Sequence, residues 1–124
     1  MLFPADLRSA LPDFYRNGPC LHFGRIVAVL HWGTEFQPIP DMQQRYDAHL
    51  LVQAGADAII GHHPHVVQPL EYIDSRPVFY SLGNFVFDQS HPDCRKASMA
   101  LLCFKASGHI IGHGGAVGQD ARVA

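Results

Sequence analysis

The sequence is poor in the features that define several common classes of protein. Its 124 residues include only three cysteines, Cys20, Cys94 and Cys103, which lie far apart and form no CxxC pair. This odd number and wide spacing favour free thiols over a disulfide framework. No run of about 18 apolar residues is present, so no segment is predicted to span a membrane. The first residues also lack the charged and apolar regions of a signal peptide.

An excess of positive charge is also missing. Nine Lys and Arg stand against eleven Asp and Glu, and the formal net charge is −2 with histidine neutral. No basic surface for nucleic acid is therefore predicted. Apolar residues make up 48% of the chain and charged residues 16%, which indicates a globular protein and argues against disorder. The length is that of one domain.

Motifs for nucleotide binding and for nucleophilic catalysis are absent as well. The sequence contains no G-x-S-x-G, no Walker A motif and no G-x-G-x-x-G. No histidine base is predicted to lie near Cys94. Catalysis by a nucleophilic side chain is therefore not expected.

Histidine, in contrast, is abundant: the chain has nine, as many as Lys and Arg together. Three of them lie close together in the stretch GADAIIGHHPH, residues 55–65. Histidine is the commonest metal ligand in proteins, so metal binding is one hypothesis. Scattered surface histidines without a function are the alternative.

The middle of the chain predicts a βαβ unit. The apolar, β-branched run at 25–31 is typical of a strand buried on both faces, as in parallel sheets. A helix is expected at 41–54, with Pro40 at its first position and Gly55 just after its end. Residues 57–61 form the next strand, which should be parallel to the first. One face of the helix is predicted to carry Met42, Tyr46, His49, Leu50 and Gln53, and His49 is expected to pack there.

The segments on either side are less regular. Residues 66–74 and 78–82 predict an antiparallel hairpin around a turn at 74–77. A last strand at 98–106 is expected to pair with Ile110 and Ile111, and the glycine-rich residues 112–124 are expected to fray. At the other end, a turn of helix at Leu7, Ala10 and Leu11 and then a loop are expected. One helix cannot cover both faces of a parallel sheet, so part of the fold is expected to be missing.

Several histidines are predicted to meet at one edge of the sheet. His31 ends the first strand, and His62, His63 and His65 follow the second. Ligands of open α/β sheets bind outside the carboxyl ends of the strands, where neighbouring strands are about 4.8 Å apart. Pro64 is expected to hold His63 extended, which puts the rings of His63 and His65 on one side. Imidazole suits zinc, iron, nickel or copper, and manganese where carboxylates join it.

Other residues near these histidines have two interpretations each. Glu35 either orients a ligand imidazole from outside the ligand shell or is a solvated loop residue. Asn84 either binds a substrate oxygen or closes an Asx-turn, and the turn is favoured slightly. His62 either lies beside the site or faces away in a structural role. Trp32 is favoured as a buried anchor over a substrate platform. The remaining histidines show no partner pattern and are expected to be non-functional: His22, His49, His91, His109 and His113.

Three segments together resemble a known family. They are VLHWGTEF at 29–36, GADAIIGHHPHVVQPLEY at 55–72 and VFYSLGNFVFDQ at 78–89. They are similar to capsule-synthesis proteins of the CapA type, the poly-γ-glutamate capsule biosynthesis (PGA_cap) group of the metallophosphoesterase, or calcineurin-like, superfamily. The resemblance implies an α/β fold, an α/β/β/α sandwich, of which this chain has the C-terminal half: one βαβ unit followed by antiparallel strands.

The resemblance also implies a metal centre and a substrate class. Two divalent ions, Mn, Zn or Fe, are expected at the carboxyl edge of the sheet. His31 and His63 match the ligands of one ion and His65 a ligand of the other. In a complete protein such a centre lowers the pKa of a bound water and clamps a phosphoester or acyl group. Expected partners are an anionic polymer or phosphoester substrate and other capsule-synthesis proteins. The family is bacterial and often membrane-anchored at the cell surface.

The resemblance is incomplete before His31. The aspartates, asparagine and further histidine of the superfamily's first half have no counterpart, because Asp6 and Asp13 lack the strand–glycine context. The chain is therefore expected to comprise a poorly assigned segment at 1–24, the C-terminal part of a CapA-like domain at 25–106 and a glycine-rich tail at 107–124. Three hypotheses follow: a metallophosphatase fragment that is inactive alone, a non-enzymatic accessory protein of capsule polymer synthesis or export, or a non-functional fragment.

Overall fold

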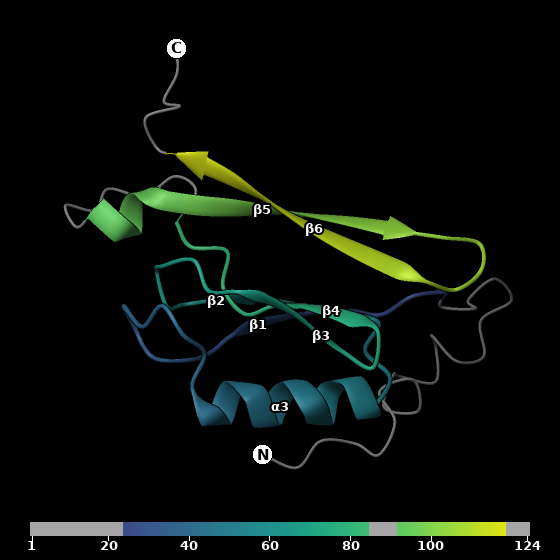
Figure 1. Cartoon of the computed structure of the whole chain (residues 1–124). Helices are drawn as coiled ribbons and strands as arrows, with labels where there is room; N and C mark the ends of the chain where they lie inside the picture. The colour runs from purple at the N-terminus through teal and green to yellow at the C-terminus, as the bar shows by residue number, and fades with distance from the viewer. Residues whose placement is uncertain (1–23, 85–91, 119–124) are drawn as a thin grey trace, which may run out of the picture.

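The described residues, 24–84 and 92–118 of a computed structural model, form a mixed α/β fold in layers (Figure 1). A four-stranded sheet with strand order β1-β2-β4-β3 lies between helix α3 on one face and the two-stranded β5–β6 hairpin on the other (Figure 1). The predicted α/β class is confirmed. The elements are β1 (Val27–His31), α3 (Met42–Gln53), β2 (Ala58–His62), β3 (Leu70–Ile73), β4 (Arg76–Phe79), the 3-10 helix η1 (Pro92–Arg95), β5 (Lys96–Phe104) and β6 (Ile110–Gly118).

The parallel part of the sheet fixes where the strands end. β1 pairs with β2 in parallel, so that His31 lies opposite His62, and β2 pairs in parallel with β4. The predicted βαβ unit is therefore confirmed. Because β1, β2 and β4 run in the same direction, the segments that follow them emerge at the same edge of the sheet.

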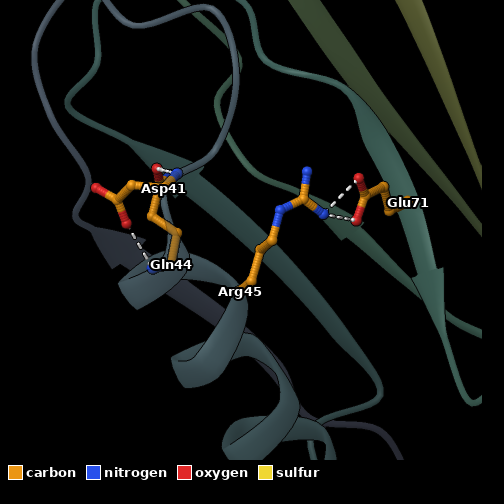
Figure 2. A network of polar contacts seen from close by, with 4 residues as sticks. All are labelled: Asp41, Gln44, Arg45 and Glu71. Carbon is orange, nitrogen blue, oxygen red and sulfur yellow. Dashed lines mark hydrogen bonds and ion pairs between the residues drawn. The ribbon is translucent and has the colours of Figure 1, made fainter.

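Helix α3 begins with a capping box. Asp41 is the N-cap: its Oδ1 accepts from Gln44 N (2.8 Å), while Gln44 Oε1 accepts from Asp41 N (3.0 Å) (Figure 2). Pro40 therefore precedes the cap, and its predicted place at the first helical position is wrong. Gly55, with a φ of 115°, follows the C-cap and confirms the predicted end of the helix. Farther along, Arg45 makes a double hydrogen bond to Glu71 on β3 (Figure 2).

The helix packs through a different face from the predicted one. Its buried residues are Gln44, Ala48 and Leu51, whereas Met42 is 87% and Tyr46 60% exposed. His49 is also exposed, so its predicted packing role is wrong. The small side chain of Ala48 belongs to the core cluster of the sheet, together with Ile59, Val78 and Tyr80. A small residue lets the helix lie close to the sheet, and the larger apolar residues are left facing outward.

Strand β1 is not buried on both faces as predicted. Ala28 and Leu30 pack against the core under α3, but Val27 is 37% and Val29 64% exposed on the opposite face. β1 is the first strand in the order of the sheet, and the helix covers only one side of it. Some apolar side chains of β1 are therefore not covered by any of the described residues.

The two hairpins extend the antiparallel part. β3 and β4 pair antiparallel around Asp74 and Ser75, both at positive φ, so the predicted hairpin is confirmed. β5 and β6 pair over nine residues each, so fraying from Gly112 to Gly118 was a wrong prediction. A Cβ on Gly112 would lie 2.8 Å from Pro77 Cβ. Glycine there lets β6 lie directly on β4.

Some predictions concern side chains rather than elements. Cys94 and Cys103 are free thiols, as predicted, and burial raises the pKa of Cys94. Within the described ranges, no helix has both the length and the apolar character needed to cross a bilayer. The predicted turn of helix before residue 12, and the predictions for Cys20, His22 and His91, lie outside the described residues.

Candidate metal centre

The site is built on unusual backbone geometry at the carboxyl edge of the parallel strands. His63 and His65 follow β2 with φ values of 108° and 63°, and Phe36, in the loop after β1, has a φ of 64°. A non-glycine residue at positive φ costs about 1–3 kcal/mol and is typical of functional sites. The prediction that Pro64 holds His63 extended is therefore wrong. The backbone at both histidines has a positive φ and is not the extended segment that the sequence predicted.

The three candidate imidazoles lie together. The ring centroids of His31 and His63 are 4.3 Å apart, and those of His63 and His65 are 5.8 Å apart. The loop that follows β1 is tied to the histidine segment, because Phe36 N donates to Pro64 O at 2.7 Å. The predicted proximity of the three rings is confirmed; their role as ligands stays a prediction.

A carboxylate lies close to two of these rings. Ligand atoms of Glu35, His63 and His65 all lie within 4.8 Å of one another. Glu35 Oε1 is 3.8 Å from His65 Nε2, too far for a hydrogen bond. Sequence reasoning gave Glu35 a role outside the ligand shell or none. In the structure its carboxylate lies within 4.8 Å of the imidazole nitrogens, close enough for Glu35 to be a direct ligand of the same ion.

Asn84 determines which nitrogen of His65 carries a proton. Its Nδ2 donates to the carbonyl oxygens of His65 (3.2 Å) and Cys94 (3.3 Å). The amide oxygen therefore faces the ring and contacts His65 Nδ1 at 3.0 Å, so Nδ1 is the donor. In the neutral ring Nε2 is then an acceptor, and it faces another acceptor, Glu35 Oε1. These contacts reach across the fold, and the favoured Asx-turn stays a prediction because residues 85–91 lie outside the described residues.

The donor set fits a divalent first-row ion. Two imidazoles and one carboxylate are ligands of zinc, iron and manganese. A ligating imidazole usually donates its other N–H to an oxygen acceptor, and the Asn84 amide oxygen is such an acceptor for His65. Bonds of about 2.1 Å place the ligand atoms of a tetrahedral ion about 3.4 Å apart. The 3.8 Å between His65 Nε2 and Glu35 Oε1 is close to that spacing. The three ligand atoms, all within 4.8 Å of one another, must close by up to about 1.4 Å to reach it.

The other candidates lie at the margin of this cluster, which comprises Glu35, His63 and His65. His31 is exposed and stacks obliquely on His63, but it is not among the three residues whose ligand atoms converge. The ring of His62 is exposed, and its backbone oxygen accepts from Trp32 N at 3.0 Å. Among the described residues no side-chain contact ties His62 to the cluster.

An aromatic pair anchors the start of the loop that follows β1. Trp32 Nε1 donates to Tyr80 O at 2.8 Å, and the two rings stack with centroids 5.8 Å apart. These contacts anchor Trp32, as the sequence favoured, although the residue is half-buried and not fully buried. Arg45 lies over the Tyr80 ring, 5.6 Å from its centroid. Burial is the main reason why the pKa of Tyr80 is raised, and the hydrogen bond to Glu71 raises the pKa of Arg45.

Sequence reasoning missed two buried glutamines beside the site. Gln44 is 1% and Gln68 3% exposed, and Gln44 Nε2 donates to Gln68 Oε1 at 2.8 Å. The pattern Asp41-x-x-Gln44 is a signal of a capping box and would have placed Gln44 at the start of the helix. No pattern in the sequence marks Gln68.

Known proteins share these segments. A family model described as "Bacterial capsule synthesis protein PGA_cap" matches residues 24–89. The PGA biosynthesis protein CapA of Bacillus subtilis (strain 168) is 42% identical over 107 residues, 86% of this chain and 28% of that protein. The capsule biosynthesis protein CapA of Bacillus anthracis is 40% identical over 86 residues, 69% of this chain and 21% of that protein.

A more distant relative has a different name. The probable polyglutamine synthesis accessory protein of Mycobacterium tuberculosis (strain H37Rv) is 31% identical over 62 residues, 50% of this chain and 16% of that protein. The match to the two CapA proteins covers about a quarter of their length, so the chain corresponds to a minor part of each.

Proposed function

The chain belongs to the bacterial capsule synthesis protein family PGA_cap, and from this we propose that it supplies the metal-binding edge of a protein that makes a capsule polymer. Glu35, His63 and His65 bind a divalent cation, and His31 is a further ligand beside His63. The observation that carries the proposal is the convergence of two imidazoles and a carboxylate within 4.8 Å. The relatives named for capsule and PGA biosynthesis support the polymer as the target.

The chain's own residues prepare the edge for an ion. Asn84 fixes the ring of His65 with Nε2 toward Glu35. The backbone bond from Phe36 to Pro64 keeps the glutamate loop on the histidine segment. A bound cation there supplies Lewis-acid chemistry toward a phosphoryl or acyl group. In the complete protein, this edge would form part of the active site of a metal-dependent hydrolase similar to the calcineurin-like phosphatases. The proposal includes a second metal ion in that active site.

Metal analysis tests the proposal. Protein purified from medium containing manganese and zinc is expected to carry bound metal, and single changes His31→Ala, His63→Ala and His65→Ala are expected to lower its content. His49→Ala is the matched control, because His49 is exposed on α3 away from the cluster. Equal metal content in all four variants and the wild type would contradict the metal site.

A second function has one observation in its favour. The relatives from Mycobacterium tuberculosis are named as accessory proteins of polyglutamine synthesis, which fits a protein that binds the polymer or its synthesis partners without catalysis. Phosphodiesterase assays with added manganese on a full-length homologue separate the two functions. Turnover that the His63→Ala and His65→Ala changes abolish supports the hydrolase; polymer binding without turnover supports the accessory role.

A further inference from the structure

We propose that the buried amide pair Gln44–Gln68 is a positioning device that holds Glu35 at the metal edge. The inference rests on the proposed metal site and adds two residues that touch none of the candidate ligand atoms in the described contacts. It concerns how the loop between β1 and α3, residues 32–41, is fixed against the histidine segment.

The two amides are buried, so their hydrogen bonds must be satisfied within the protein. Gln44 is 1% and Gln68 3% exposed, and buried amides are costly unless their hydrogen bonds are made. Gln44 Nε2 donates to Gln68 Oε1 (2.8 Å), and Gln68 Nε2 donates to the backbone oxygen of Gln37 (2.8 Å). Gln44 Oε1 accepts from Asp41 N (3.0 Å). The amides therefore form a chain of bonds that ends on the loop at both ends.

The attachment points lie on both sides of Glu35. Before it, Gly33 packs on the amide of Gln44 so closely that an added Cβ would be 2.6 Å from Gln44 Cδ. After it, the loop is bonded at Gln37 and at Asp41. A loop held at residues before and after Glu35 has few conformations left. The half-exposed carboxylate, at 52%, thus gains a defined position from buried groups.

Gln68 also belongs to the histidine segment. It follows His65 by three residues, and its backbone N donates to Ser81 O at 3.1 Å. Ser81 precedes Asn84, whose amide oxygen contacts His65. One side chain therefore joins the glutamate loop to the segments that place the imidazole and its amide partner.

Helix capping does not account for this arrangement. A capping box needs only an acceptor on Gln44 for the N–H of Asp41. It uses neither the donation from Gln44 to Gln68 nor the donation from Gln68 to Gln37. A glutamate at position 44 would satisfy the cap equally well but has no N–H to give. An amide at both positions is needed for the chain of hydrogen bonds that holds the loop, not for the helix cap.

The first experiment measures Zn²⁺ affinity of the full chain by calorimetric titration. Gln68→Met keeps the side-chain size and removes both amide functions, so affinity is expected to fall about 10-fold or more. The matched control is Gln53→Met, which changes an exposed glutamine at the end of α3. Its affinity is expected to equal that of the wild type. Gln44→Glu, which keeps the cap, is also expected to lose affinity.

A double-mutant cycle separates positioning from general damage. If Gln68 acts through Glu35, Gln68→Met costs affinity in the wild type but less than about 2-fold when Glu35→Gln is already present. Hydrogen exchange of the metal-free protein gives a second readout that stands even if Gln68→Met binds no zinc. The amide of Phe36, bonded to Pro64 O, is expected to exchange about 10-fold faster in both glutamine variants.

The outcomes are distinguishable. Wild-type binding that neither Gln68→Met nor Gln44→Glu weakens, with unchanged exchange at Phe36, overturns this inference and leaves the metal site standing. An equal loss with and without Glu35→Gln also overturns it, because the effect then does not act through Glu35. No Zn²⁺ binding by the wild type overturns the metal site and this inference together.

Discussion

At residue 61 there is no space for a side chain. A Cβ on Gly61 would lie 2.1 Å from Tyr80 O and 2.3 Å from Trp32 Nε1. These atoms are the acceptor and donor of the hydrogen bond that anchors Trp32. The glycine before the histidine pair is therefore explained by close contact between neighbouring strands, with no special φ needed.

Gly61→Ala is expected to lower the free energy of unfolding by about 2–3 kcal/mol, because a methyl group must displace a backbone carbonyl or the indole. The measurement is urea denaturation followed by circular dichroism. Gly115→Ala is the control, since an added Cβ there meets nothing within 4 Å. Equal effects of the two changes would contradict the packing at Gly61.

The sequence predicted that the three candidate imidazoles lie close together, but it did not predict the backbone conformation that carries them. The ends of apolar runs placed His31, His63 and His65 at one edge, because parallel strands end together. The positive φ of His63 was missed, since the residue before a proline is normally extended. Position thus followed from strand direction, whereas ring orientation depends on tertiary contacts.

At the scale of elements, the start of α3 depends on one aspartate. Asp41→Ala removes the acceptor of Gln44 N and is expected to cost about 1 kcal/mol of stability. Asp47→Ala, on the same helix but away from the cap, is expected to cost less, because Asp47 Oδ1 takes part in an exposed bond to Gln43. Thermal denaturation compares the two variants, and a larger loss from Asp47→Ala would contradict the role of the cap.

Element types were easier to predict than element faces. Strands β1, β2 and β4 follow from apolar runs bounded by glycine, proline and charged residues. The buried face of α3 was predicted wrongly because a glutamine is expected to face solvent and a methionine is expected to be buried. In the structure Gln44 is buried and Met42 is exposed. β6 was missed beyond Ile111 because glycine reads as loop; here glycine is what lets the strand lie on Pro77.

At the scale of the whole molecule, large apolar side chains are exposed on β1 and β5. Val29 is 64%, Met99 58% and Leu101 60% exposed. Exposed apolar strand surfaces favour association. The chain is expected to self-associate, and light scattering coupled to size-exclusion chromatography measures this.

Val29→Lys and Leu101→Lys are expected to reduce the association, because a charge on an apolar strand surface opposes burial. Tyr46→Lys is the control: Tyr46 is 60% exposed as well, but on the outer face of α3. A monodisperse wild-type monomer with a sharp, cooperative thermal transition would contradict the prediction.

The metal site is tested most directly by anomalous X-ray diffraction at the manganese edge on crystals grown with Mn²⁺. The proposal predicts an anomalous peak about 2.2 Å from a carboxylate oxygen of Glu35 and from imidazole nitrogens of His63 and His65. A peak elsewhere, or electron density in which His65 Nε2 lies within hydrogen-bond distance of Glu35 and no peak lies between them, would contradict it.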